Sequence, residues 1–436
     1  MRRVLMVTPH FPPDSSAASH RVRLVAPYLS RNGWDPTIVT VDPRDYEAGV
    51  EPALNRLVPA SLRVVRSRAW KAAWTRPVGF GDLGLRALAN LRSTCRRLLQ
   101  EEHFDALFVT VYPVYPALLG PGLKRRFGVK FVLDYQDPWV GSWGLTVGGG
   151  PNGAPDRRSR LSRRLSTWLE PIAVRAADAI TAVSAGTHEE IAARIPAARR
   201  LIRETIPIGW DRDDFTRLEL AGAPFFRTGN GAVNVVYVGT ILPNGIDTLR
   251  ALLEGVRRLR DQDADAYARL RLWFLGTSNQ FHEDAPLRVL PMAMELGVAD
   301  VVREIAPRIP YADALATLQQ AHAILLLGST EPHYTASKLY PALLADRPIL
   351  AAFHEASSVV DILKRLGAGA SVIRLVTYGN AGPRTDDRMD CLARHLAAIA
   401  RQPLRPAALD LSPIDDVSAE ELARKLCGVL DQISAH

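Results

Sequence analysis

Short apolar segments alternate with longer amphipathic segments along this chain, and the whole alternation occurs twice. The amphipathic segments repeat their apolar residues at helical spacing, whereas the short runs are apolar throughout, as buried parallel strands are. Strands that alternate with helices predict a parallel sheet with helices on both faces. The fold class is therefore predicted to be α/β, with two doubly wound parallel sheets in series. The expected strands are residues 3–7, 36–41, 106–110, 130–134 and 179–183, then 233–239, 270–276, 323–328 and 348–352.

The length of 436 residues exceeds what one hydrophobic core usually supports. We expect an N-terminal domain over residues 1–206 and a second domain over residues 207–415. A C-terminal helix at 416–436 is expected to join the first domain.

Three cysteines, Cys95, Cys391 and Cys427, are far apart and lack the spacing of a zinc site or a disulfide framework. No stretch approaches the roughly 20 apolar residues of a membrane span, and the opening apolar run is too short for a signal peptide. These features predict a cytoplasmic protein.

The charge is distributed unevenly. The formal net charge is +8, but residues 1–205 hold 30 Lys and Arg against 18 Asp and Glu, a net of +12. The remainder holds 24 against 28, a net of −4. A basic half is typical of a solvated arginine-rich surface or of contact with an anionic membrane face.

Six arginines between residues 157 and 175 flank an apolar set that includes Leu165, Trp168 and Ile172. This segment could form an interfacial helix or a helix packed on the sheet. No nucleic-acid-binding module is recognisable, so no nucleic-acid partner is expected.

Ligands of open α/β sheets bind beyond the carboxyl ends of the strands. The loops after the first strand of each series, residues 9–19 and 240–247, are therefore the expected site. No G-x-G-x-x-G follows an opening strand, which disfavours a dinucleotide-dependent oxidoreductase.

Several segments of the chain resemble landmarks of family-4 glycosyltransferases of the GT-B fold, in a bacterial branch. They occur in the family's order between residue 4 and about residue 352. The resemblance implies two Rossmann-like domains facing across a cleft, with the acceptor on the N-terminal domain and a nucleotide-sugar donor on the C-terminal domain. The segments are TPHFPPDSSAASHR, VLDYQDPW, AADAITAVSAG, IPIGWDRDDF, VYVGTILPNG, RIPYADALATLQQAHAILLL and SKLYPALLADRPIL.

Residues that bind the donor follow from this resemblance. The small-residue loop after the first strand would let a diphosphate approach a helix start, although a simple capped turn reads the same way. A lysine at a helix start, Lys338, is a suitable diphosphate clamp, because a cation is not otherwise favoured there. The expected donor contacts are Ser16, Ala17, Ala18, Gly239, Thr240, Ile309, Ser337, Lys338 and Leu339.

The expected catalytic residues are Glu331, Asp137 and His10. Glu331 matches the family glutamate that contacts the transferred sugar, although a solvated loop glutamate has the same sequence pattern. Asp137 ends a strand and would face the acceptor. His10 lies in the first loop and would stand at the cleft, although most lone histidines are incidental. Arg21 and Trp139 are expected on the acceptor side.

Two departures from the family pattern concern the donor. Pro341 stands where a second glutamate usually holds the ribose hydroxyls, and the loop 240–245 lacks the usual Arg and Lys. The site therefore predicts either a UDP- or a dTDP-linked donor. A lysine and two helix ends could carry the diphosphate charge without a metal ion, so no metal and no cofactor are expected, and the transfer is expected to be retaining.

The acceptor class stays open at this level: a polysaccharide, a lipid-linked or a small-molecule acceptor would fit. A nucleotide-sugar epimerase or hydrolase on the same fold is one alternative. A non-catalytic partner subunit is another, and Pro341 with the missing Arg and Lys favours it.

Overall fold

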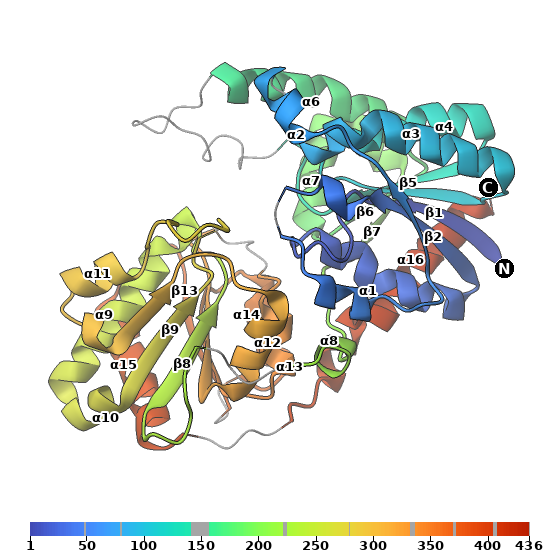
Figure 1. The fold of residues 1–436 in the computed structure, drawn as a ribbon. Helices are drawn as coiled ribbons and strands as arrows, with labels where there is room; N and C mark the ends of the chain where they lie inside the picture. The colour runs from blue at the N-terminus through green and yellow to red at the C-terminus, as the bar shows by residue number, and fades with distance from the viewer. Residues whose placement is uncertain are drawn as a thin grey trace. The chain divides into compact units, whose positions relative to one another are not determined.

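A computed structural model describes residues 1–47, 49–78, 81–140, 157–220, 225–278, 280–331, 336–368, 372–403 and 408–435 of the chain. Two compact units are present, as Figure 1 shows by colour: residues 1–211 with 417–436, and residues 212–416. Each unit has its own sheet and its own core.

The N-terminal unit contains a sheet of seven strands in the order β3-β2-β1-β4-β5-β6-β7, and all its pairs are parallel. The prediction of a parallel sheet is confirmed here. Sequence reasoning missed the edge strands β3 and β7, because they lack a buried apolar run. The strands are β1 (Arg2–Val7), β2 (Trp34–Val41), β3 (Arg63–Ser67), β4 (Ala106–Thr110), β5 (Lys130–Tyr135), β6 (Ala179–Ala182) and β7 (Ile202–Thr205).

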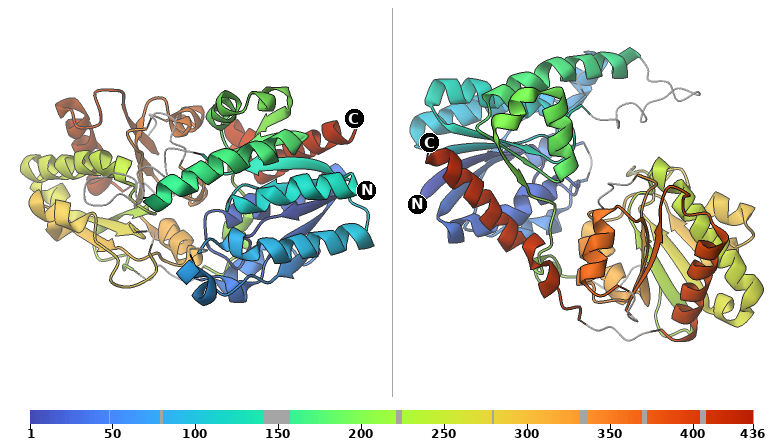
Figure 2. Two further views of the ribbon diagram at one scale, coloured as in Figure 1. Left: turned by 90° about the horizontal axis from the view of Figure 1, so that it is seen from above. Right: turned by 180° about the vertical axis from the view of Figure 1, so that it is seen from behind.

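Helices cover both faces of this sheet (Figure 1). Alternate residues of β1 divide between two cores, as the period of a strand requires: Leu5 and Val7 pack toward α3, α4 and α6, whereas Val4 and Met6 pack toward α1 and α16. Figure 2 shows α16, the last helix of the chain, lying along the N-terminal unit. The helices are α1 (Ser19–Leu29), α2 (Ala72–Thr75), α3 (Leu83–Glu101), α4 (Leu119–Phe127), α6 (Arg157–Ala176), α7 (Ala185–Arg194) and α16 (Ala419–Ser434).

The C-terminal unit contains six strands in the order β10-β9-β8-β11-β12-β13, again parallel in every pair. Its strands are β8 (Val233–Val238), β9 (Leu270–Leu275), β10 (Val302–Ile305), β11 (Ala323–Leu327), β12 (Ile349–His354) and β13 (Ile373–Tyr378). Its helices are α8 (Asp213–Thr216), α9 (Ile246–Gln262), α10 (Ala264–Arg269), α11 (Leu290–Glu295), α12 (Tyr311–Gln320), α13 (Leu339–Leu344), α14 (Ser358–Arg365) and α15 (Asp386–Arg401). In each unit the loop after the first strand, β1 or β8, begins at the carboxyl edge of the sheet.

Among the helices of the described residues, none combines the length and the apolar character that crossing a membrane requires.

Candidate active site

Three backbone segments converge at the carboxyl edge of the C-terminal sheet. Gly239 follows β8 with φ +125°, a conformation that side-chain-bearing residues rarely adopt. Gly276 follows β9, and a Cβ on it would lie 4.0 Å from the backbone nitrogens of both Gly239 and Ile309. The structure therefore brings the predicted residues Gly239 and Ile309 together, with a glycine between them that keeps the backbone accessible.

Lys338 extends over the same segment. Its side chain lies about 3.8 Å from the position of a Cβ on Gly239, and its Nζ lies 4.3 Å from the centre of the Tyr237 ring. The ammonium group also donates a hydrogen bond to the Tyr237 hydroxyl, which in turn donates to the Thr240 carbonyl at 3.0 Å. No carboxylate stands among these contacts. Burial of the ammonium lowers the pKa of Lys338 to about 7, so this cation lacks a strong counter-charge.

A small cavity of about 10 Å³ lies beside Lys338, lined by Tyr237, Thr240, Leu242, Gly328 and Ser329 among others. That volume is about the room of one water molecule. A larger anion must therefore displace the Lys338 side chain from Tyr237 or bind above it.

The helix that follows Lys338 is short. It spans Leu339–Leu344, and Ser337 and Lys338 form the turn before it. Leu339 is buried, whereas Ser337 is exposed. Pro341 is the third residue of α13, in the first turn, where the missing N–H removes no intrahelical hydrogen bond.

Glu331 stands exposed after β11 and is held by a residue that the sequence reasoning did not select. The Asn244 side-chain amide donates to Glu331 Oε1 at 2.7 Å, and the Asn244 carbonyl accepts from the Thr330 backbone N–H at 2.9 Å. These contacts join the loops after β8 and β11. The carboxylate is thus oriented at the edge that also carries Gly239 and Lys338.

Arg288 brings a second cation to the loop after β8. Its guanidinium donates to the Ile241 carbonyl, and its backbone N–H donates to Glu304 Oε1 at 2.9 Å. The sequence pattern placed no cation in the loop 240–245. Arg288 is 43 to 48 positions away in the sequence, so only the tertiary fold could reveal this contact.

The small-residue loop of the N-terminal unit is organised around Asp14. The Asp14 carboxylate accepts from the Ser16 backbone N–H at 2.9 Å and from the Ser16 hydroxyl at 2.8 Å. Ala17 is exposed and Ala18 is buried as the residue before α1. Burial raises the pKa of Asp14, but the His10 and Ser16 hydrogen bonds outweigh it and hold the pKa below its usual value. An ionised carboxylate under this loop opposes a phosphate at Ser16, so the loop is a weaker anion site than its sequence suggested.

His10 lies between two tyrosine rings at the same edge. Its ring is stacked on Tyr46 at 6.2 Å between centroids and tilted against Tyr112 at 5.8 Å. Its Nδ1 is hydrogen-bonded to Asp14 Oδ2. This arrangement orients the imidazole, as a carboxylate partner does in many proton-transfer sites. The loops after β1, β2 and β4 together supply these side chains.

Arg21 is not at an acceptor surface, and its predicted role is corrected. The side chain is 2% exposed and pairs with Asp134, which is 0% exposed, at 2.5 Å. Its Nη1 donates to the carbonyls of Ile206 and Pro207. Arg21 therefore ties α1 to β5 and to the segment after β7.

Trp139 is likewise in the core of the N-terminal unit, at 6% exposure, and not on an acceptor surface. Asp137, two residues earlier, is exposed, as an acceptor-facing carboxylate would be. The protein atoms around the Asp137 carboxyl raise its pKa through desolvation.

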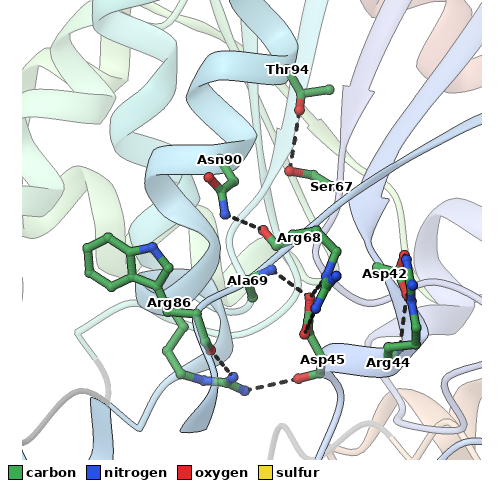
Figure 3. Close-up of polar contacts among 10 residues, drawn as sticks. Asp42, Arg44, Asp45, Ser67, Arg68, Ala69, Arg86, Asn90 and Thr94 are labelled. Atoms are coloured by element: carbon green, nitrogen blue, oxygen red, sulfur yellow. Dashed lines mark hydrogen bonds and ion pairs between the residues drawn. The ribbon is translucent and has the colours of Figure 1, made fainter. Parts of the chain in front are cut away.

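A polar network fixes the ends of β2 and β3 (Figure 3). The Asp45 carboxylate accepts from Arg68 Nε at 2.7 Å and from the Ala69 backbone N–H at 2.8 Å. Arg86 of α3 donates to the Trp70 carbonyl at 2.6 Å and to the Asp45 carbonyl at 3.3 Å. The backbone of Trp70 is thereby held in place while its ring remains 55% exposed.

The residues that the structure describes contain no group of three or more His, Cys, Asp or Glu side chains that could hold a metal ion.

Comparison with known protein families gives a match within the N-terminal half of the chain. Residues 16–204 match the sequence profile of the Glycosyl transferase 4-like domain. No curated protein sequence matches the chain.

Solved structures match over the whole chain. A UDP-forming α,α-trehalose-phosphate synthase from Burkholderia vietnamiensis has a TM-score of 0.57 at 10% identity, with 100% of each chain covered. Alr3699/HepE from Anabaena, in complex with UDP-glucose, has a TM-score of 0.53 at 14% identity, with 100% of this chain and 99% of that chain covered. The trehalose-6-phosphate phosphatase N-terminal domain of Candida albicans has a TM-score of 0.55 at 14% identity, with coverages of 100% and 95%. The predicted family resemblance and the GT-B fold are confirmed.

Proposed function

We propose that this chain, whose residues 16–204 are a glycosyl transferase 4-like domain within a GT-B fold, transfers a sugar from a nucleotide-diphosphate sugar to an acceptor. The observation that carries the proposal is Lys338, a poorly compensated cation over the open backbone of Gly239. A diphosphate supplies the counter-charge that the protein does not. UDP-glucose is the first donor to test, because the structure of HepE, which has the same fold, is of its complex with that compound.

Lys338 would act on the leaving group. As the bond between sugar and diphosphate breaks, negative charge grows on the departing phosphate, and a fixed cation stabilises that charge more than it stabilises the bound donor. Arg288, on the Ile241 carbonyl, is the residue of this unit best placed to add a second positive charge.

The transfer is proposed to be retaining and to need no metal ion. Glu331, oriented by Asn244, supports this reading, because a single carboxylate beside the donor can position the sugar while the leaving phosphate accepts the proton of the acceptor hydroxyl. The anomeric configuration of the first-formed product, read by proton NMR, tests retention. Activity that survives exhaustive chelation tests the metal.

The direct test is donor binding and turnover in Lys338→Ala, with Lys364→Ala as the control. Lys364 is an exposed lysine of α14 in the same unit. Loss of one charge-assisted contact predicts about a tenfold or greater loss of UDP-glucose affinity in Lys338→Ala. Equal affinity in the two variants would refute the proposal. UDP released without an acceptor would favour a hydrolase, and a folded protein that binds no nucleotide would favour a non-catalytic subunit.

A peripheral contact with an anionic membrane is part of the proposal, since it would bring a lipid-linked acceptor to a cytoplasmic enzyme at the inner face of the membrane. Helix α6 carries three exposed apolar side chains at helical spacing: Leu165 at 45%, Trp168 at 80% and Ile172 at 52%. The opposite side of the helix, with Ala173 and Val174, is buried in the core. The helix packed on the sheet and the interfacial helix of the sequence analysis are therefore one helix with two apolar faces.

Positive charge on α6 lies beside these exposed apolar side chains. Arg163, Arg164 and Arg175 are exposed, whereas Glu170, the acidic residue of the helix, is buried and paired with Arg194. The side chains of residues 157–162 lie outside the described part of the chain. Apolar side chains beside exposed arginines suit the boundary between lipid headgroups and acyl chains.

Vesicle flotation tests the membrane contact. Anionic vesicles should float the protein, neutral vesicles should not, and the double variant Trp168→Ala/Ile172→Ala should lose the binding. Met294→Ala is the matched control, because Met294 is an exposed apolar residue of the C-terminal unit, at 63%. Flotation that is equal in all three proteins would place the contact elsewhere, and no flotation at low salt would favour a soluble acceptor.

A further inference from the structure

The C-terminal unit has a second cationic hollow at the opposite end of its sheet. It has a volume of about 820 Å³, within the range of small-molecule sites. Its lining includes four arginines and no Asp or Glu: Arg227, Arg269, Arg271 and Arg303. Arg271 and Arg303 stand at the starts of β9 and β10, whereas Gly239 and Gly276 follow the ends of β8 and β9. A strand of six residues separates the two regions by roughly 17–20 Å.

The strand register explains why these side chains gather. Leu270, Leu272 and Phe274 of β9 enter the hydrophobic core, so Arg271 and Trp273 point to the other face. Arg303 pairs with Trp273 in the register of β10 with β9. Paired residues of neighbouring strands share a face, and the guanidinium groups therefore stand beside the indole ring.

The hollow is held by polar contacts rather than by ion pairs. Arg271 Nη1 donates to the carbonyls of Ala268 and Leu270 at 2.9 and 2.6 Å. Arg303 Nη1 donates to those of Asp300 and Val302 at 3.0 and 2.8 Å. Backbone carbonyls orient these guanidiniums without neutralising them.

Aromatic packing closes the other side of the hollow. Trp273 Nε1 donates to Asn234 Oδ1 at 3.0 Å, and the Phe226 ring lies 5.6 Å from the indole. The Asn234 amide also donates to the Arg227 carbonyl at 3.4 Å. The segment of residues 225–227 is thereby fixed against the sheet.

The lining of the hollow contains no counter-charge. Residues 212–416 hold 22 Lys and Arg against 24 Asp and Glu, so the unit is slightly acidic. Other arginines there form ion pairs, such as Arg250 with Glu295 at 2.8 Å and Arg258 with Asp390 at 2.6 Å. Within the described residues, none of the four arginines of the hollow forms an ion pair with a carboxylate. Four like charges held together favour an anion among them.

We propose that this hollow is a second anion site, separate from the donor site, and that it binds the phosphate groups of a soluble phosphorylated small molecule. Guanidinium groups match phosphate oxygens through paired N–H donors, which favours phosphate over an isolated carboxylate. The small-molecule size of the hollow favours a soluble ligand over a lipid surface.

Isothermal titration with inorganic pyrophosphate tests the proposal. Pyrophosphate should also bind at Lys338, so the comparison is made in Lys338→Ala, where one site should remain. Adding Arg271→Ala and Arg303→Ala should weaken that site at least tenfold, and higher salt should weaken it further. Arg257→Ala, an exposed arginine of α9, is the matched control and should bind as Lys338→Ala does.

Two outcomes overturn the proposal: no pyrophosphate binding in Lys338→Ala, or equal affinity with and without the two arginines. Where the alanine variants fail to fold by circular dichroism, Arg271→Lys and Arg303→Lys replace them. These keep the charge but lose the paired donors, and unchanged affinity would contradict the guanidinium site. Binding to phosphatidylglycerol vesicles without binding to pyrophosphate would mean a lipid surface and would likewise overturn it.

Discussion

The charge state of Lys338 makes donor affinity depend on pH, and the sign follows from its surroundings. Burial lowers the pKa of the free ammonium to about 7, so at pH 8 about nine-tenths of the ligand-free protein holds a neutral lysine there. A bound diphosphate favours the charged form and raises that pKa. Binding above pH 7 therefore takes up a proton, and affinity falls as the pH rises.

The size of this pH effect on donor affinity follows from the charged and neutral states of Lys338. Once the free lysine is mostly neutral, affinity should fall by up to about tenfold for each further pH unit, or about 1.4 kcal/mol, until the pH reaches the raised pKa of the donor-bound lysine. Between pH 6 and 7 the change should be less than about threefold, because much of the lysine is still charged. UDP-glucose is the suitable ligand, since its diphosphate is esterified at both ends and does not titrate in this range.

Titration calorimetry in buffers of different ionisation enthalpy measures both quantities. Proton uptake should be about one half per donor at pH 7 and should approach one at pH 8. Lys338→Arg is the control, because arginine stays charged throughout, and its affinity should be flat over the same range. Wild-type affinity that is flat from pH 6.5 to 9, or an equal slope in Lys338→Arg, would refute the assignment.

Three further predictions concern separate residues. Glu331→Gln should lower turnover by about a hundredfold or more while UDP affinity stays within about twofold, because the base and phosphates lie elsewhere; wild-type turnover by product assay would exclude Glu331 from the reaction. At Pro341, no carboxylate meets the ribose, so competition binding should rank dTDP at least equal to UDP; a tenfold preference for UDP would mean that another residue grips the ribose. Arg21→Met should reduce the free energy of unfolding by about 3–5 kcal/mol, because it leaves Asp134 buried without its partner. Chemical denaturation measures this loss, and a change below about 1 kcal/mol would contradict the buried ion pair.

Sequence reasoning succeeded where burial was continuous. The apolar runs of β1, β4 and β8 are buried along nearly their whole length, so their composition alone identified them, and their order gave the two parallel sheets. The edge strand β3 reads RVVRS and is only half-buried, so it gave no such signal. The apolar spacing of residues 161–177 predicted a helix where the structure has α6, but the spacing could not show that this helix has two apolar faces.

Site residues were harder to predict, because a side chain's partners are set by the tertiary fold. Arg21 and Trp139 lie in segments that match the family landmarks, and a motif does not show which way a side chain points. Both side chains turn into the core, although their segments match the landmarks. The reverse holds for Arg288, which no motif marked, and for Asn244, which lies in a landmark segment but was not selected as a site residue. Both became visible only through contacts with residues far along the chain.

Pro341 and the loop 240–245 together first suggested a weakened donor site. Their consequences differ once the structure is considered. Pro341 removes a carboxylate and adds nothing in its place, so the loss should appear in the choice of nucleoside.

The missing Arg and Lys of the loop have a different consequence. The Ile241 carbonyl accepts a hydrogen bond from the Arg288 guanidinium, and Lys338 lies over Gly239 without a carboxylate against it. Other segments of the same unit thus bring positive charge to the loop after β8, where we propose that the diphosphate binds. A non-catalytic subunit would have no need to keep a desolvated cation at this edge, since holding Lys338 there costs the protein stability and gains nothing without an anion. The donor side therefore argues for an enzyme with altered nucleoside selectivity rather than for a relic of one.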